Sequence, residues 1–282
     1  MNISQEVSSR AGSVSVGGSE YPNFSKRKVA TDVTVEEGRS IFSNIQKFLR
    51  YLLSSNVGEV LTMFLGVIGA AALGLQAAEF GSHIVVPLLA TQILWINLVT
   101  DSGPALALGL DPADPGVMHR APRDPRKRVI DGWMWFDIVF VGLIMGIGTL
   151  AVMDASLTGG FLGGHGDMRY AQTMAFTTLV FFQLFNVFNS RSDTESAFKG
   201  MFSNKWIWLA ILISVLLQIL VIYAPFLQPA FNTMPLTLNE WLVCVAVAST
   251  VLWAREIVKL LFRLLGLRRQ RHAQREMAAH QA

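Results

Sequence analysis

The chain has 282 residues, of which 52% are apolar and only 15% charged, and its mean hydropathy is +0.42. This composition is too apolar for an ordinary soluble domain, and several long uncharged runs indicate a membrane protein with several spans. The net charge of +3 comes from the loops and the tail, so it indicates membrane topology and lipid contact and gives no reason to expect nucleic-acid binding.

The first 53 residues precede any apolar run. Residues 1–30 are rich in Ser and Gly, a composition that cannot bury a core, and we expect a disordered lead-in there. In residues 31–53, apolar side chains recur at close to helical spacing and alternate with charged ones. This pattern predicts a cytoplasmic stalk helix that runs directly into the first span, at 54–77.

The remaining apolar runs predict five further spans, at 87–109, 133–154, 171–190, 206–224 and 239–262. Every second connection is rich in Lys and Arg, whereas the others nearly lack them. By the positive-inside rule this alternation places both termini in the cytoplasm. The expected fold is therefore all-α, a bundle of six transmembrane helices in the lipid bilayer over 54–265, followed by a basic cytoplasmic tail at 266–282 that contacts lipid headgroups.

Polar residues interrupt the second span at 95–104. Asn97, Thr100 and Asp101 stand at i, i+3 and i+4, so their oxygen-bearing side chains share one face of a helix. Pro104 cannot donate to the carbonyl of Thr100, and Gly103 loosens the backbone further, which predicts a break at Gly103-Pro104. Unwound backbone at membrane depth often marks an ion site, so we predict a cation site here.

The first span carries a similar pair, because Asn56 and Glu59 stand at i and i+3. Glu59 and Asp101 each lie more than a turn inside an apolar run. An acid at such a position is by default a functional residue. The alternative is that each is a neutralised acid, or one at a helix end whose side chain reaches to the membrane surface. For Asn56, Asn97 and Thr100 the alternative is hydrogen bonding between helices.

In the fourth span, Gln183, Asn186 and Asn189 form a stripe along one face of the helix. These amides are equally suited to binding an ion and to forming hydrogen bonds between packed helices. A constellation made only of oxygen ligands favours a hard cation such as calcium over zinc or copper. The scattered histidines and the single Cys244 form no cluster with zinc spacing.

Several segments closely resemble the calcium-pump branch of the P-type ATPases. They are Val-Glu-Glu-Gly-Arg at 35–39, Phe-Leu-Arg-Tyr-Leu-Leu-Ser-Ser-Asn-Val-Gly-Glu at 48–59, Asn-Leu-Val-Thr-Asp at 97–101, and the runs at 104–112 and 120–125. The resemblance covers roughly residues 33–265 and implies the fifth to tenth membrane helices of such a pump, in a plasma membrane.

The resemblance also implies ion ligands, namely Asn56, Glu59, Asn97, Thr100 and Asp101. Gln183 aligns with a position where the sarcoplasmic-reticulum type has a glutamate ligand in its eighth membrane helix. A neutral amide there would weaken one of the two ion positions of that type.

The sequence contains no Asp-Lys-Thr-Gly phosphorylation motif, no Thr-Gly-Glu actuator motif and no Pro-Glu-Gly-Leu-Pro helix break. We therefore expect no ATP site, no ATP hydrolysis by the chain alone and a low resting affinity for calcium. The chain is then a fragment or one part of a split pump whose actuator, phosphorylation and nucleotide domains belong to a separate chain. The alternatives are a regulatory or structural membrane subunit without transport, and a passive cation pathway.

Overall fold

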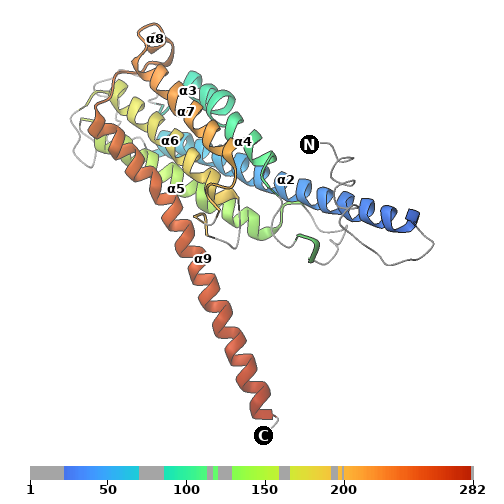
Figure 1. The fold of residues 1–282 in the computed structure, drawn as a ribbon. Coiled ribbons are helices and arrows are strands. Elements are labelled where there is room, and N and C mark those ends of the chain that lie inside the picture. Colours follow the sequence, from blue (N-terminus) through green and yellow to red (C-terminus); the bar gives the residue numbers. More distant parts are fainter. Residues whose placement is uncertain are drawn as a thin grey trace.

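The computed structural model describes residues 22–69, 86–112, 117–119, 129–158, 166–191, 196–198 and 200–280, and for 22–31, 119 and 263–280 it describes the backbone alone. The described fold is a helical bundle, as predicted (Figure 1). Five helices are long and apolar enough to cross a membrane: α2 at Pro22–Ile68, α5 at Gly132–Ser156, α6 at Met168–Ser190, α7 at Lys205–Tyr223 and α9 at Leu238–His280.

The predicted second span consists of three short helical pieces. These are α3 at Ala90–Trp95, the π-helix η2 at Ile96–Thr100, and α4 at Ser102–Gly109. None of them is long enough to span a membrane alone, so the described residues contain five helices of spanning length and the sixth span stays a prediction.

The break in this segment lies slightly earlier than predicted. The turn falls at Asp101, and α4 then continues through Gly103 and Pro104. Proline is tolerated there because it stands in the first turn of α4, where backbone N–H groups need no partner from the preceding helix. The expected break at Gly103-Pro104 is therefore corrected to the junction of η2 and α4.

The long terminal helices exceed their predicted bounds. Helix α2 begins at Pro22, so residues 22–30 are helical rather than part of a disordered lead-in. Proline suits the first position of a helix, and the Lys and Arg residues that follow are good helix formers. Residues 1–21, the end of the predicted first span at 70–77 and most of the basic loop at 120–128 lie outside the described residues.

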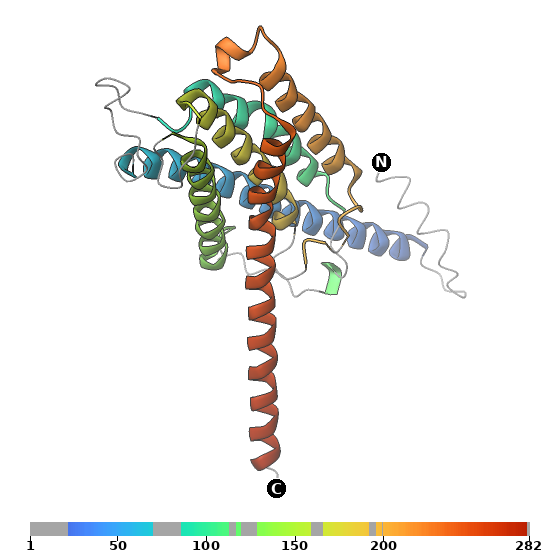
Figure 2. The same ribbon diagram turned by 90° about the vertical axis from the view of Figure 1, so that its left-hand side faces the viewer.

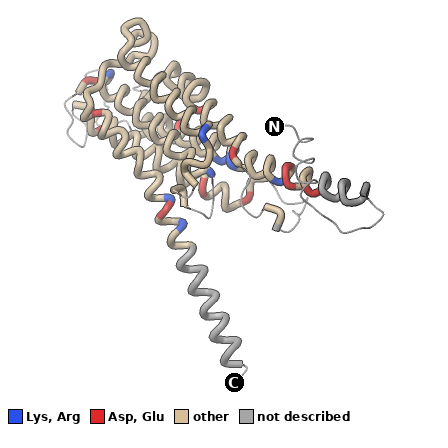
Figure 3. Tube along the Cα trace, viewed as in Figure 1, with Lys and Arg blue, Asp and Glu red and all other residues tan. Residues whose placement is uncertain are grey.

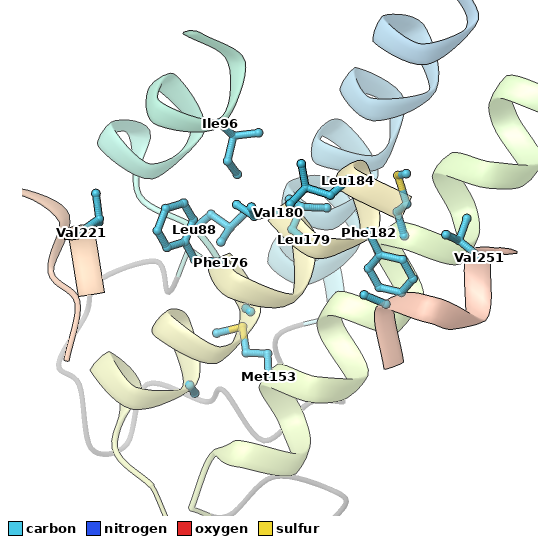
Figure 4. Packing of buried hydrophobic residues seen from close by; sticks show 14 of the residues in the cluster. Leu88, Ile96, Met153, Phe176, Leu179, Val180, Phe182, Leu184, Val221 and Val251 are labelled. Carbon is cyan, nitrogen blue, oxygen red and sulfur yellow. The ribbon is translucent and has the colours of Figure 1, made fainter. Parts of the chain in front are cut away.

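Helix α6 is the centre of the bundle. Phe176, Leu179 and Phe182 of α6 are fully buried, and they pack with residues of the surrounding helices, including Ile96 of η2, Met153 of α5, Val221 of α7 and Val251 of α9 (Figure 4). A second view shows α9 and α5 beside α6, with α2 passing behind them (Figure 2). Because α6 is enclosed, its polar side chains face other helices rather than lipid.

Helices α2 and α5 approach closely through glycines. A Cβ atom on Gly142 of α5 would lie 2.6 Å from a methyl carbon of Val57, and one on Gly146 would lie 3.2 Å from the Cβ of Leu61. Small residues allow two helix backbones to pack closely within a membrane. This contact fixes the rotation of α2 and therefore the direction in which Glu59 points.

Candidate cation site

At the junction of η2 and α4, some backbone groups lack their usual hydrogen bonds within the helix and bond to other groups instead. The N–H of Asp101 donates to the carbonyl of Ile96 at 2.9 Å, which closes the π-helical turn. The carbonyl of Thr100, which Pro104 cannot serve, accepts instead from the hydroxyl of Ser214 on α7 at 3.2 Å. The predicted bare carbonyl thus has a side-chain partner, and α7 is tied to the break. Such π-helical turns are frequent at functional sites.

Glu59 joins three elements of the bundle. Its Oε2 accepts from the amide of Asn97 on η2 at 2.5 Å, and its Oε1 accepts from the amide of Gln183 on α6 at 2.9 Å. Only 4% of Glu59 is exposed, so the two amides replace the water that an ionised carboxylate would otherwise require. The structure therefore brings together three of the six residues singled out from the sequence.

Asp101 is fully buried beside this group. Its Oδ1 accepts from the hydroxyl of Tyr51 on α2 at 2.9 Å, and it interacts electrostatically with Glu59. Within the described part of the chain, Oδ2 of Asp101 and Oε1 of Gln183 are buried and accept no hydrogen bond. Buried oxygens of this kind are costly unless a donor or a cation approaches them.

Thr100 and Asn56 differ in their relation to this group. Thr100 is 1% exposed and its hydroxyl donates to the carbonyl of Ile96 at 3.0 Å, which leaves the oxygen lone pairs available. The side chain of Asn56 is exposed and donates to the carbonyl of Leu52 at 2.8 Å, one turn back on its own helix. The described structure therefore does not join Asn56 to the other five residues.

The other two amides of the α6 stripe serve packing. Asn186 donates to the hydroxyl of Ser54 at 2.7 Å, and Asn189 donates to the carbonyl of Val251 at 3.1 Å. Both contacts hold α6 against its neighbours, α2 and α9. Of the stripe, only Gln183 contacts the carboxylate of Glu59.

Tyr51 and Ser214 are the contacts that sequence reasoning missed. A tyrosine near the end of an amphipathic helix is usually a packing residue, and a lone serine in an apolar span usually bonds its own helix. The available signal for Tyr51 was its position: it lies eight residues before Glu59 and so on nearly the same face of α2.

Two buried ion clusters lie toward the end of the bundle at which α4 and α6 finish. Asp111 pairs with Lys47 at 2.8 Å and with Arg191 at 3.1 Å. Asp137, in the first turns of α5, is only 2% exposed and pairs with Arg255 at 2.7 Å and with Arg50 at 3.7 Å. These groups tie α2 to the rest of the bundle, and in the coloured part of Figure 3 other charged residues are sparse along α5, α6 and α7.

The donor set of the site suits a hard cation. Among the described residues, no three His, Cys, Asp or Glu side chains converge, so the candidate site combines two carboxylates with neutral oxygen groups. Glu59 and Asp101 supply carboxylates, while Asn97, Thr100 and Gln183 supply amide and hydroxyl oxygens, the ligands that calcium prefers. In the arrangement described, the amide N–H groups of Asn97 and Gln183 occupy the places that a cation would take beside Glu59.

Comparisons with known proteins identify the family to which the chain belongs. The family described as "Cation transporting ATPase, C-terminus" matches residues 85–261. The Calcium-transporting ATPase of Bacillus subtilis is 38% identical over 227 residues, which are 80% of this chain and 23% of that protein. The Calcium-transporting ATPase 1 of Bacillus cereus is 38% identical over 240 residues, 80% of this chain and 25% of that protein.

A fungal relative, the Endoplasmic reticulum calcium ATPase srcA of Aspergillus fumigatus, is 34% identical over 254 residues, again 80% of this chain and 25% of the relative. The chain thus spans about a quarter of the length of the curated relatives it matches. The resemblance inferred from the motifs is confirmed: the chain belongs to the cation-transporting ATPase family, of which it contains the C-terminal membrane region.

Proposed function

We propose that this chain is the ion-binding membrane half of a calcium-transporting P-type ATPase, and that Glu59, Asn97, Thr100, Asp101 and Gln183 are ligands of the transported ion. The observation that carries the proposal is the buried carboxylate of Glu59, held by amides from η2 and α6 at 2.5 and 2.9 Å. A buried acid that contacts no basic side chain among the described residues is suited to receive a cation.

Ion binding at this site is an exchange of partners. A cation approaching Glu59 displaces the N–H groups of Asn97 and Gln183, and rotation of each amide then turns its oxygen toward the ion. Asp101 contributes its Oδ2, which accepts no hydrogen bond among the described residues. The ion thus gains oxygen ligands from both amides and from Asp101.

The remaining ligands come from helices that pack on α2. Asn56, Val60 and Phe64 stand at i, i+4 and i+8, and all three are exposed along one face of α2. An amide beside a cation site, continued by a stripe of large apolar side chains, suits contact with further protein helices better than contact with lipid. Such helices complete the shell of about six to eight oxygens that calcium requires, with Asn56 joining it.

ATP-driven transport also requires actuator, phosphorylation and nucleotide domains, and we assign none of them to residues 1–282. The test is to purify the chain from its own membranes and identify what accompanies it by mass spectrometry. A partner with those domains, and calcium-stimulated ATP hydrolysis only in the complex, is the expected result. Hydrolysis by the chain alone, abolished in Asp101→Asn, would contradict the assignment.

Two further outcomes separate the proposal from other classes of membrane protein. Calcium flux into liposomes without ATP would identify a passive cation pathway. A complex in which Asp101→Asn leaves both calcium transport and calcium binding unchanged would identify a regulatory or structural subunit. The proposal requires that neither is observed.

A further inference from the structure

A hollow lies between the ends of three helices, and it is not part of the candidate ion site. It has a volume of about 1000 Å³ and is lined by the end of α5, the beginning of α6 and the beginning of α9. A volume of this order fits a ligand of small-molecule size. All three helices are apolar enough to span the membrane, so the hollow opens at one of its two surfaces.

The inner part of the hollow is an apolar furrow between two helices. Ala151 and Ala155 of α5 face Val243 and Val247 of α9 across it, and each pair is spaced by one helical turn. The alanines are exposed, and their small side chains leave the width of the furrow open. A furrow of this kind accommodates a hydrocarbon chain.

The outer part of the hollow is acidic. Asp167 and Glu240 both line it, and none of the described lining residues is Lys or Arg. Arg169 follows Asp167 closely in sequence, but its guanidinium donates to the carbonyl of Thr233 at 2.5 Å and does not line the hollow. An apolar interior with a negative mouth is complementary to an amphiphile with a positive head.

Hydrogen bonds fix the carboxylate of Glu240 at the mouth. Its Oε1 accepts from the hydroxyl of Tyr170 at 2.8 Å, and its Oε2 accepts from the N–H of Thr237 at 2.5 Å. A carboxylate has about four acceptor positions, so each oxygen can accept one more hydrogen bond. A primary ammonium group offers three N–H donors, and its bonds to carboxylates are charge-assisted.

We propose that this hollow binds one membrane phospholipid with a primary-amine headgroup, with the ammonium at Asp167 and Glu240 and an acyl chain between α5 and α9. A choline headgroup has no N–H to donate, and a glycerol headgroup has no positive charge. The hollow extends over only about two helical turns, at 151–156 of α5 and 239–247 of α9, whereas a transmembrane helix of another protein needs about 20 residues of contact length.

The test uses the full chain reconstituted in vesicles with equal amounts of ethanolamine, choline and glycerol phospholipids. After mild extraction, native mass spectrometry counts the lipids retained. The site retains one ethanolamine phospholipid, and Asp167→Asn with Glu240→Gln lowers that retention at least about tenfold, because each replacement removes the charge from an acceptor of the ammonium. Both replacements keep an acceptor oxygen for the N–H groups of Tyr170 and Thr237.

A second variant addresses the furrow independently. Ala151→Phe with Ala155→Phe fills it from exposed positions and removes retention of the lipid, whereas Glu37→Gln on the exposed stalk face leaves retention unchanged. Equal retention of all three headgroups, or retention of ethanolamine lipid unchanged in the carboxylate variant, would overturn the proposal. So would a transmembrane segment of another protein that cross-links to the furrow.

Discussion

The hydroxyl of Tyr51 donates to Oδ1 of Asp101 at 2.9 Å, and both residues are fully buried. This contact joins the stalk helix to the unwound turn between η2 and α4. Tyr51 is preceded by Arg50, which pairs with Asp137 on α5. A shift of α2 along its axis would therefore move Tyr51 and Arg50 together, and with them the contacts to Asp101 and Asp137. The stalk helix is thus directly connected to the candidate ion site.

Tyr51→Phe removes one donor from a buried carboxylate. We expect it to lower the free energy of unfolding in detergent micelles by about 1–3 kcal/mol, because Oδ1 of Asp101 loses its partner. On the proposed assignment, calcium binds the same carboxylate and no longer competes with the hydroxyl, so calcium raises the stability of the variant more than that of the original chain. Chemical denaturation followed by tryptophan fluorescence, with and without calcium, measures both effects.

Tyr223→Phe is the matched control for that substitution. The hydroxyl of Tyr223 likewise donates a hydrogen bond, in this case to the carbonyl of Leu236, and it accepts from the indole of Trp241 at 3.0 Å. Its loss leaves the calcium dependence of stability unchanged. If calcium stabilised the two variants equally, Tyr51 would not be part of the candidate site.

Gln183→Glu places a second carboxylate against Glu59. Calcium affinity rises with the number of charged ligands, so we expect binding about tenfold tighter, measured by titration of the reconstituted chain. Without calcium the two acids repel each other, and the thermal stability of the variant falls. Gln172→Glu makes the same change on the same helix outside the site and leaves calcium affinity unaltered. Unchanged affinity in Gln183→Glu would show that Gln183 is not a ligand.

Asp111→Asn removes the carboxylate shared by Lys47 and Arg191. Asp111 is 5% exposed and its pairs are buried, and breaking a buried ion pair costs about 3–5 kcal/mol. We expect a loss of that order in the free energy of unfolding. Asp32→Asn, on an exposed part of the stalk, is the control and changes it little. Equal stability of the two variants would mean that the Asp111 cluster does not hold α2 to the bundle.

Gly142→Ala tests the close contact between α2 and α5. The added Cβ would lie 2.6 Å from Val57 and 3.1 Å from the backbone nitrogen of Gly58, so the helices must separate. We expect a loss of about 1–3 kcal/mol in the free energy of unfolding, together with weaker calcium binding because Glu59 moves. Gly109→Ala meets nothing within 4 Å and raises stability by up to about 1 kcal/mol. A stable Gly142→Ala variant would contradict the contact.

Much of the fold follows from local sequence signals. Runs of apolar residues predicted the helices α5, α6 and α7 to within a few residues, because a membrane span must be helical and of nearly fixed length. The break near Asp101 followed from Gly103 and Pro104, although its position shifted because proline fits the first turn of α4. Helix α2 extends beyond its predicted start because composition alone does not reveal where a helix begins.

The site was only partly predictable, for a different reason. Spacing placed Asn97 and Asp101 on one face, and an acid within an apolar run marked Glu59. Which residues meet across helices depends on helix rotation, and a single sequence carries no direct record of it. The pairing of Asp137 with Arg255, 118 positions apart in the sequence, and the exposure of Asn56 could be obtained only from the folded arrangement.

The most direct test of the central claim is equilibrium binding of radioactive calcium to the purified chain in lipid nanodiscs. The chain is expected to bind calcium saturably but weakly, with a dissociation constant of about 10⁻⁴ M or more, because its ligand shell is incomplete. Asp101→Asn and Glu59→Gln each weaken binding at least about tenfold, whereas Glu37→Gln on the exposed stalk leaves it unchanged. Binding that is equal in the chain, Asp101→Asn and Glu59→Gln, or no saturable binding at all, would contradict the assignment of the ion site.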